Sequence, residues 1–265
     1  MNYSLGFLGC GNMGSALVAA AAKTVNGNAI AVFDHNKTKT ERLEKAFGVA
    51  TTSAKELAQK AKFIILGVKP QAMQNALSEI AEILRGREDI TVVTMAAGLS
   101  VAAIRSYIGK QLPVIRIMPN TPVTVGAGMV LYTCDGVSEE VETEFLKAFE
   151  RAGIFDKLPE EKLDAGSALS GCGPAFVYAF AEALADGGVE CGLPRDKAAL
   201  YAAQTLLGAA EMLLEYGHPA DLKDAVCSPG GTTIAGIHAL EEAGLRAAAM
   251  NAVAAAYRRT LELKK

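Results

Sequence analysis

The chain has 265 residues, of which 51% are hydrophobic and 21% are charged, and its formal net charge at pH 7 is −3. This length accommodates one large domain or two smaller ones, and the apolar content is enough for a sizeable core. The slightly negative charge argues against nucleic acid or an anionic membrane surface as a partner. The five cysteines are far apart and form no CxxC pair, so neither a zinc site nor a disulfide framework is expected.

An apolar strand is expected at the N-terminus, which leaves no room for a signal peptide before it. The longest weakly polar stretch, 198–214, contains Tyr201, Gln204, Thr205 and Glu211. We interpret it as a buried helix rather than a membrane span. Because the cysteines follow no disulfide pattern, the expected compartment is a reducing cytoplasm.

A glycine-rich turn near the N-terminus is the first motif with a chemical meaning. Tyr3–Leu8 is mostly apolar, and Gly9-x-Gly11-x-x-Gly14 follows it and leads into the alanine-rich segment 15–22. In a dinucleotide-binding fold the first glycine allows the tight turn, the second lets the backbone approach a pyrophosphate, and the third lets the helix pack on the strand. The free amides and the dipole of that helix would favour the phosphates. An ordinary glycine-rich strand–helix turn is the alternative.

Strand and helix patterns alternate after this turn. The run 63–68 is unbroken and apolar, as in a parallel strand that is buried on both faces. Strands are expected at 29–33, 49–51, 63–68, 90–95 and 114–118. Helices are expected at 37–47, ending at Gly48, from the capping box Ser53-x-x-Glu56 onward, at 71–84, and at 101–107 with Ser100 as the cap. The alternation predicts an α/β fold with a doubly wound, Rossmann-type sheet.

The pattern changes in the second half of the chain. A Pro/Gly loop at 119–128 precedes two closing strands, 129–132 and 154–158, around a helix at 139–152. From residue 160 onward the sequence lacks β-branched runs, and its spacing is helical. Helices are expected at 162–169, 175–191, 195–216, 220–226, 232–241 and 245–263. We therefore expect a dinucleotide-binding domain over 1–159 and an all-helical domain over 160–265, whose small residues would suit an oligomer interface.

Three further turns follow expected strands at their carboxyl ends, at 67–70, 95–98 and 118–122. Ligands of an open parallel sheet bind just outside these ends, so the turns would line one crevice together with residues 9–14. The alternative is that Pro70, Gly98 and Pro122 only terminate strands.

Two motifs stand out in the helical half. Ser170-Gly171-Cys172-Gly173-Pro174-Ala175 opens a long helix, which indicates either a site or close packing at a helix start. The block 227–233 places two glycines before two threonines at the start of another helix. Free amides at Gly231, Thr232 and Thr233 would hold a carboxylate, and a plain threonine N-cap is the alternative.

Other catalytic patterns are missing from the sequence. The three histidines, His35, His218 and His238, have neither metal-ligand spacing nor an evident triad partner, and there is no Walker loop. We expect no metal, and a bound cofactor would carry the chemistry.

Taken together, these blocks resemble the Δ1-pyrroline-5-carboxylate reductase family over nearly the whole chain. The matching blocks are 6–14 (GFLGCGNMG), 68–70 (VKP), 96–98 (AAG), 116–122 (RIMPNTP), 169–176 (LSGCGPAF), 183–188 (ALADGG) and 222–224 (LKD) followed by 228–233 (SPGGTT). The resemblance implies an oxidoreductase for the last step of proline biosynthesis. A hydride would pass from NAD(P)H to the C=N carbon of the cyclic imine and give L-proline. It also implies a homodimer built from the helical domain, or a higher homo-oligomer such as a decamer.

The resemblance also implies roles for residues. The substrate carboxylate would lie on the backbone amides of Gly230, Gly231 and Thr232, and the hydroxyl of Thr233 would bind the ring nitrogen as the catalytic group. Ser170 and Asn120 would shape the nicotinamide end. The expected substrate residues are Ser228, Gly230, Gly231, Thr232, Thr233 and Ser170. The expected cofactor residues are Gly9, Cys10, Gly11, Asn12, Met13, Gly14, Asp34, His35, Asn36, Val68, Lys69, Pro70, Ala96, Ala97, Gly98 and Asn120.

The choice between the two nicotinamide cofactors is open at this point. Asp34 lies twenty residues after Gly14, where an acid takes the ribose 2′-hydroxyl of NAD. Family members that use NADPH often have Asn-Arg here, whereas this chain has Asp34-His35 followed by Asn36 and Lys37. The last two would still receive a phosphate, and we place NADP(H) ahead of NAD(H).

Two other functions compete with this interpretation. One is a related reductase that acts on another imine or on a β-hydroxyacid. A β-hydroxyacid dehydrogenase needs a lysine on the first long helix of its second domain, and 175–191 contains none. The other is a nucleotide-sensing protein without turnover, which would not need the 228–233 block.

Overall fold

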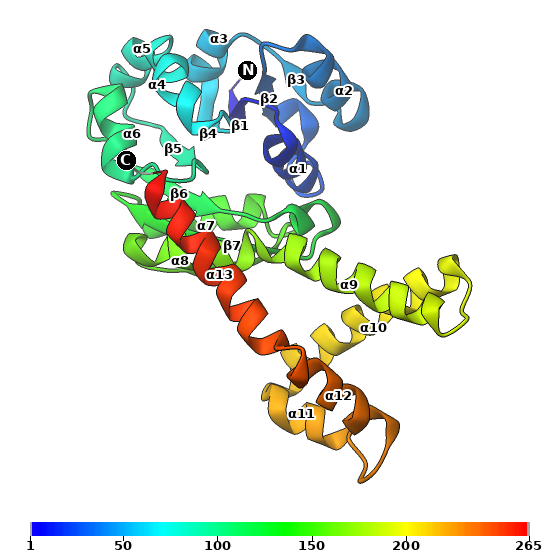
Figure 1. Cartoon of the computed structure of the whole chain (residues 1–265). Coiled ribbons are helices and arrows are strands. Elements are labelled where there is room, and N and C mark those ends of the chain that lie inside the picture. Colours follow the sequence, from blue (N-terminus) through cyan, green and yellow to red (C-terminus); the bar gives the residue numbers. More distant parts are fainter. Residues whose placement is uncertain (1, 264–265) are drawn as a thin grey trace. The chain divides into compact units, whose positions relative to one another are not determined.

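The structure is a computed structural model that describes residues 2–263 and contains two compact units. The first unit runs to Cys172 and takes in the C-terminal segment from Ala256, and the second is Gly173–Ala255. Figure 1 labels their helices and strands, and each unit is described separately below.

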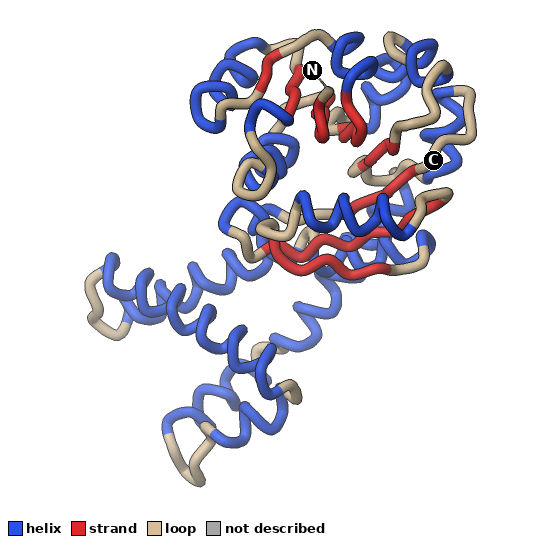
Figure 2. Tube along the Cα trace, turned by 180° about the vertical axis from the view of Figure 1, so that it is seen from behind, coloured by secondary structure: helices blue, strands red, loops and turns tan. Residues whose placement is uncertain are grey.

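The first unit is built on an eight-stranded sheet with the order β3-β2-β1-β4-β5-β6-β7-β8. The six strands from β3 to β6 are parallel to one another, β7 is antiparallel to β6, and β8 is parallel to β7. Figure 2 shows these strands in red. They are β1 (Tyr3–Leu8), β2 (Ile30–Phe33), β3 (Ala50–Thr51), β4 (Ala61–Leu66), β5 (Thr91–Thr94), β6 (Val114–Met118), β7 (Gly128–Asp135) and β8 (Gly153–Lys157).

Helices connect these strands and cover both faces of the sheet. Phe63 and Ile65 of β4 pack into the core cluster that contains α1 and α7, whereas Ile64 and Leu66 pack into the cluster that contains α3 to α6. Because alternate residues of this strand enter two cores, its run from Phe63 to Leu66 is apolar without a break. The helices are α1 (Asn12–Ala21), α2 (Lys37–Phe47), α3 (Ala54–Lys60), α4 (Pro70–Ser78), α5 (Ala81–Arg85), α6 (Val101–Ile108), α7 (Glu139–Ala148) and α8 (Glu160–Ser170), with 3₁₀ turns η1 (Gly27–Ala29) and η2 (Thr121–Val125).

Several local predictions are confirmed. Helix α2 has the expected bounds and ends at Gly48, whose φ of 66° is the left-handed conformation of a C-terminal glycine. Ser53 and Ser100 cap α3 and α6 through their hydroxyl groups. The expected capping box at Ser53 is only half formed, because the Glu56 carboxylate accepts from the Thr52 hydroxyl and from Lys60 instead.

Two expected helices are wrong in extent. The single helix expected at 71–84 is two helices, α4 and α5, because the Ile80 N–H bonds the Leu77 carbonyl and breaks the α-helical ladder. Met73, Leu77, Ile80 and Leu84 are nevertheless all buried, so the apolar spacing marks the core face across the break. The helix expected at 139–152 stops at Ala148, and the loop expected at 119–128 contains η2.

The second unit is helical, as expected. It contains α9 (Gly173–Glu190), α10 (Arg195–Tyr216), α11 (Pro219–Ala225), α12 (Thr232–Glu242) and most of α13 (Leu245–Glu262). Its one buried cluster among the described residues is small and consists of Ala185, Ala198 and Ala202 between α9 and α10. Helix α8 belongs to the first unit, where it packs on β6 and β7. The domain division at 159/160 stays a prediction.

Candidate functional site

Close backbone contacts build the glycine-rich turn after β1. Gly9 has a φ of 102°, which favours glycine, and its N–H bonds the Phe33 carbonyl at 2.8 Å. A Cβ on Gly14 would lie 2.4 Å from the Gly9 carbonyl oxygen, and one on Gly67 would lie 2.3 Å from the same atom. Glycine is therefore required at these positions to pack α1 and the end of β4 against the turn.

Gly11 differs from its two neighbours in the motif. It is the N-cap of α1 and offers no side-chain cap to the first-turn amides, and a Cβ on it would meet no atom of the chain within 4 Å. The space beside Gly11 and the uncapped end of α1 together suit a phosphate group. Gly11 thus leaves room for a ligand, whereas Gly9 and Gly14 shape the turn.

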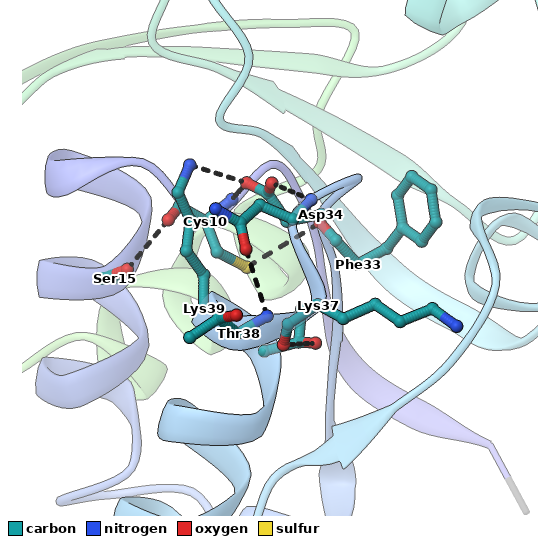
Figure 3. A network of polar contacts seen from close by, with 9 residues as sticks. Cys10, Ser15, Phe33, Asp34, Lys37, Thr38 and Lys39 are labelled. Atoms are coloured by element: carbon teal, nitrogen blue, oxygen red, sulfur yellow. Dashed lines mark hydrogen bonds and ion pairs between the residues drawn. The ribbon is translucent and has the colours of Figure 1, made fainter.

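Asp34, at the end of β2, is tied to the glycine turn and to the start of α2 (Figure 3). Its carboxylate accepts from the N–H of Cys10 at 2.8 Å, the N–H of Asn36 at 2.9 Å and the Lys39 ammonium at 3.4 Å. Partial burial favours the neutral carboxyl, but these N–H groups and Lys39 favour the carboxylate more and hold the pKa of Asp34 below its ordinary value.

The Cys10 thiol lies under the turn. Burial, with a smaller contribution from the charge of Asp34, raises the pKa of Cys10 to about 12. A buried thiol that stays protonated is not a nucleophile at neutral pH, so the expected role of Cys10 rests on its backbone. The side chain of Asn36 is also engaged, because it accepts from the Thr38 N–H and caps α2.

A small cavity opens beside the turn at the carboxyl ends of β1, β2 and β4. His35 lines it and packs its ring edge-on against Phe33, with 5.3 Å between ring centroids. Sequence reasoning found Gly9, Asp34, His35 and Val68 of this cavity. It missed Leu8, Phe33, Ala76 and Glu79, because no motif marks them and only the strand register and the break after α4 bring them there.

The other expected turns follow neighbouring parallel strands. Lys69 is the N-cap of α4, Pro70 is its first residue, and Gly98 has a φ of 79° after β5. Because β1, β4, β5 and β6 are neighbours in one parallel sheet, their carboxyl ends lie along one edge. The structure thereby brings 9–14, 68–70, 96–98 and Asn120 to the carboxyl ends of neighbouring strands, and one crevice lined by all of them stays a prediction.

Asn120 is engaged by the chain itself. Its side-chain NH₂ donates to the Ser170 carbonyl at 3.0 Å, and its side-chain oxygen accepts from the Met129 N–H at 2.9 Å. The Ser170 hydroxyl donates to the Gly166 carbonyl within α8. Asn120 and Ser170, which were expected separately at the nicotinamide end, are thus hydrogen-bonded neighbours.

A buried charged cluster near this edge was missed by sequence reasoning. Arg116 of β6 is 1% exposed and donates to Asp164 at 2.7 Å and to Glu160 at 3.2 Å, both on α8. Glu160 also accepts from the Val101 N–H at the start of α6. A charged residue inside the apolar strand 114–118 is a sequence signal for a buried pair, but it does not identify the partners.

The 228–233 block lies in the second unit and opens α12. Gly231, not a threonine, is the N-cap, and no side chain caps the helix. The plain threonine cap is therefore wrong. The expectation of a free Gly231 amide is also wrong, because its N–H donates to the Ser228 carbonyl at 3.0 Å across a turn that requires the φ of 68° at Gly230. The amides of Thr232 and Thr233 in the first turn remain candidates for a carboxylate.

No group of three or more metal-ligating side chains occurs among residues 2–263. Two family models match separate parts of the chain. One, described as pyrroline-5-carboxylate reductase dimerisation, matches residues 160–263, and the other, described as NADP oxidoreductase coenzyme F420-dependent, matches residues 4–98.

A curated relative extends this likeness over the full length. Pyrroline-5-carboxylate reductase from Escherichia coli strain K12 is 40% identical over 270 residues, which cover 100% of both chains. The chain belongs to the pyrroline-5-carboxylate reductase family. Sequence analysis therefore identified the family correctly.

Solved structures of pyrroline-5-carboxylate reductases share the fold. The Plasmodium falciparum enzyme with NADP bound has a TM-score of 0.89 at 31% identity and covers 100% of this chain and 99% of its own. The Coxiella burnetii enzyme has a TM-score of 0.90 at 32% identity and covers 100% of both chains. These likenesses confirm a Rossmann-type sheet followed by a helical dimerisation region.

Proposed function

We propose that this protein reduces Δ1-pyrroline-5-carboxylate to L-proline with NAD(P)H, as the last step of proline biosynthesis. The observation that carries the proposal is the full-length likeness to pyrroline-5-carboxylate reductases. The site chemistry agrees with it. A protonated imine is already a good hydride acceptor, so the protein has to orient the reactants and exclude water and needs no strong general acid.

For the cofactor, we propose a nicotinamide dinucleotide at the carboxyl ends of the parallel strands, with its pyrophosphate at the start of α1. The empty space beside Gly11 and the uncapped helix N-terminus support this fit. When bound, the cofactor supplies the hydride. Residues 9–14, 34–36, 68–70 and 96–98 would hold it.

NADP(H) is our first choice and NAD(H) the second. A related structure holds NADP, and Asp34 has Lys39 beside it, which offsets the negative charge that would repel a 2′-phosphate. The proposed phosphate contacts are the side-chain NH₂ group of Asn36, whose oxygen caps α2, and the ammonium group of Lys37. The ratio of kcat/KM for the two reduced cofactors tests this choice, and a clear preference for NADH would contradict it.

For the substrate, we propose that the carboxylate binds the first-turn amides of α12, at Thr232 and Thr233, beside Ser228 and Gly230. The Thr233 hydroxyl would bind the ring nitrogen and act as the catalytic group. Thr233→Ala should lower kcat/KM by about tenfold to a thousandfold, the range for one positioned group. Thr232→Ala on the same turn is the matched comparison, and unchanged kinetics in the Thr233 variant would contradict the role.

For the assembly, we propose a homodimer or a higher homo-oligomer formed through the helical region from residue 160 onward. The dimerisation family model covers this region, and the second unit exposes many large apolar side chains. The location of the protein in the cytoplasm also stays a prediction.

One assay tests the activity. Purified protein is mixed with the cyclic imine and either reduced cofactor, and cofactor oxidation is followed together with the formation of proline. Turnover that matches proline formation supports the proposal. Turnover with other imines or β-hydroxyacids alone would favour a different reductase, and cofactor binding without any turnover would favour a nucleotide sensor.

A further inference from the structure

Helix α8 is fastened to the sheet of the first unit at both of its ends. Near its start, the buried Arg116 of β6 donates to Asp164 and Glu160. At its last residue, Asn120 in the loop after β6 donates to the Ser170 carbonyl. One strand and its loop therefore anchor a helix that begins 42 residues further on, since β6 ends at Met118 and α8 begins at Glu160.

The packing between these two anchors is equally close. A Cβ on Gly166, in the middle of α8, would lie 2.3 Å from the Cδ1 atom of Leu131 on β7. Leu163 packs against Met118 and Leu131 in a small buried cluster of its own. Helix α8 therefore has one position on the sheet, although the dimerisation family model begins at its first residue.

Of the two anchors, Asn120 is the one that lies beyond the carboxyl end of β6, beside the other expected cofactor turns. Asn120 is 8% exposed, and both ends of its amide are used, by the Ser170 carbonyl and by the Met129 N–H. An amide in this position can hold two backbone groups at a fixed separation, which a carboxylate cannot do because it only accepts. The side chain is thus built to hold the end of α8 relative to β7.

We propose that Asn120 is a positioning residue for hydride transfer, which acts by holding Ser170 and the turn at 171–172 at the carboxyl end of β6. This inference rests on the proposed function, because it assumes that the nicotinamide end of the cofactor binds beside Ser170. Both ends of the Asn120 amide are used within the chain, so this positioning role replaces the direct cofactor contact expected from the sequence. The Arg116 cluster is the second anchor and sets the position of the helix start.

The test uses Asn120→Asp in the full-length protein. This variant keeps the acceptor for the Met129 N–H but replaces the donor to Ser170 with an oxygen. Asn28→Asp is the matched control, because Asn28 is exposed and the chemical change is the same. If Asn120→Asp does not fold, Asn120→Ser carries the same prediction, since its hydroxyl is too short to bridge both groups.

Two measurements separate positioning from binding. The Kd for NADP⁺, from calorimetry, should stay within about twofold, while kcat with the cyclic imine should fall by about tenfold to a hundredfold, as expected when reacting groups are displaced. Amide hydrogen exchange over residues 167–172 should become about fivefold faster, the equivalent of one hydrogen bond, while exchange over β1 and α1 stays unchanged.

Three results would overturn the proposal. A matching loss of NADP⁺ affinity would make Asn120 a direct cofactor ligand. Faster exchange with an unchanged kcat would make the bond structural only. Unchanged exchange would mean that Asn120 does not hold α8. A wild-type protein that fails to reduce the imine would refute the proposed function. Amide exchange and NADP⁺ binding need no turnover, so they would still show whether Asn120 holds the end of α8.

Discussion

The two units differ in how far they bury their apolar side chains. The first unit buries its strands and helices in two large clusters on the two faces of the sheet. The second has one small alanine cluster, while Leu200, Leu207 and Leu214 on α10 are 58%, 52% and 78% exposed. These leucines are seven residues apart and so follow one face of the helix. The prediction that 198–214 is a buried helix is therefore wrong within this chain, where only Ala198 and Ala202 of α10 are buried. The first unit thus has a core of its own, whereas the second needs another surface to cover it.

The difference extends to polar groups. In the first unit, charged side chains such as Arg116 are buried and paired, and they fix elements relative to the sheet. In the second unit, the ion pairs are between exposed side chains, for example Arg195 with Asp186. The buried charges of the first unit thus hold one helix on its sheet, whereas the Arg195–Asp186 pair of the second unit lies in solvent.

The largest expected effect is on the free energy of unfolding of the first unit. Arg116→Met removes the buried ion pairs that Arg116 makes with Asp164 and Glu160, and the free energy of unfolding should fall by about 3–5 kcal/mol. Urea denaturation measures the change, with Arg151→Met as the exposed control. The double variant Arg116→Met/Asp164→Leu should recover most of the loss, and a single variant as stable as wild type would contradict the account.

The next effect concerns the surface of the second unit. Leu207→Asp places a carboxylate in the middle of the exposed leucine row, and burying an unpaired charge in an interface costs several kcal/mol. Light scattering should show a smaller assembly than for wild type, while the Kd for NADP⁺ is unchanged. Thr205→Asp is the control, because Thr205 is exposed and faces the other side of the same helix. If the mass and the concentration dependence of Leu207→Asp match those of wild type, α10 does not form the interface through this face.

A smaller effect separates the two roles of glycine in the nucleotide turn. Gly14→Ala forces a Cβ against the Gly9 carbonyl and should lower both the melting temperature and cofactor affinity. Gly11→Ala meets no atom of the chain, so it should leave the melting temperature unchanged and weaken NADP⁺ binding by about tenfold to a hundredfold, as when charge-assisted hydrogen bonds are lost. Unchanged NADP⁺ affinity in Gly11→Ala would show that the phosphates lie elsewhere.

The smallest effect is the pH dependence at Asp34. Its pKa is lowered in the folded chain, so the carboxylate contributes stability above the unfolded pKa of about 3.9, and this contribution is lost as pH falls through the folded pKa. Wild type should therefore lose more stability than Asp34→Asn as the pH falls from neutral to below the unfolded pKa. Parallel stability curves for the two proteins would contradict the proposed hydrogen bonds of Asp34.

The sheet and the glycine turn were predictable because their signals are local. The run 63–68, the caps at Ser53 and Ser100 and the glycine after α2 each carry their meaning within a few residues. The break between α4 and α5 was not predictable, since the apolar spacing continues across it and no glycine or proline marks it.

The connections between distant segments could not be found in the sequence. Arg116 and its partners on α8 are 44 and 48 residues apart, and Asn120 and Ser170 are 50 apart. Arg116 stands out as the one charge in an apolar strand, but only the fold shows its partners on α8. The same holds for the Gly231 amide, which is taken up by a turn that the spacing of the block does not reveal.

The most direct test of the proposed chemistry follows the hydride itself. The protein is supplied with the cyclic imine and with NADPH that carries deuterium at the transferable position of the nicotinamide ring, and the proline formed is analysed by mass spectrometry. A direct hydride transfer to the imine carbon predicts proline that is one mass unit heavier, with the deuterium on the ring carbon next to nitrogen. Unlabelled proline, or binding of NADPH without any proline, would contradict it.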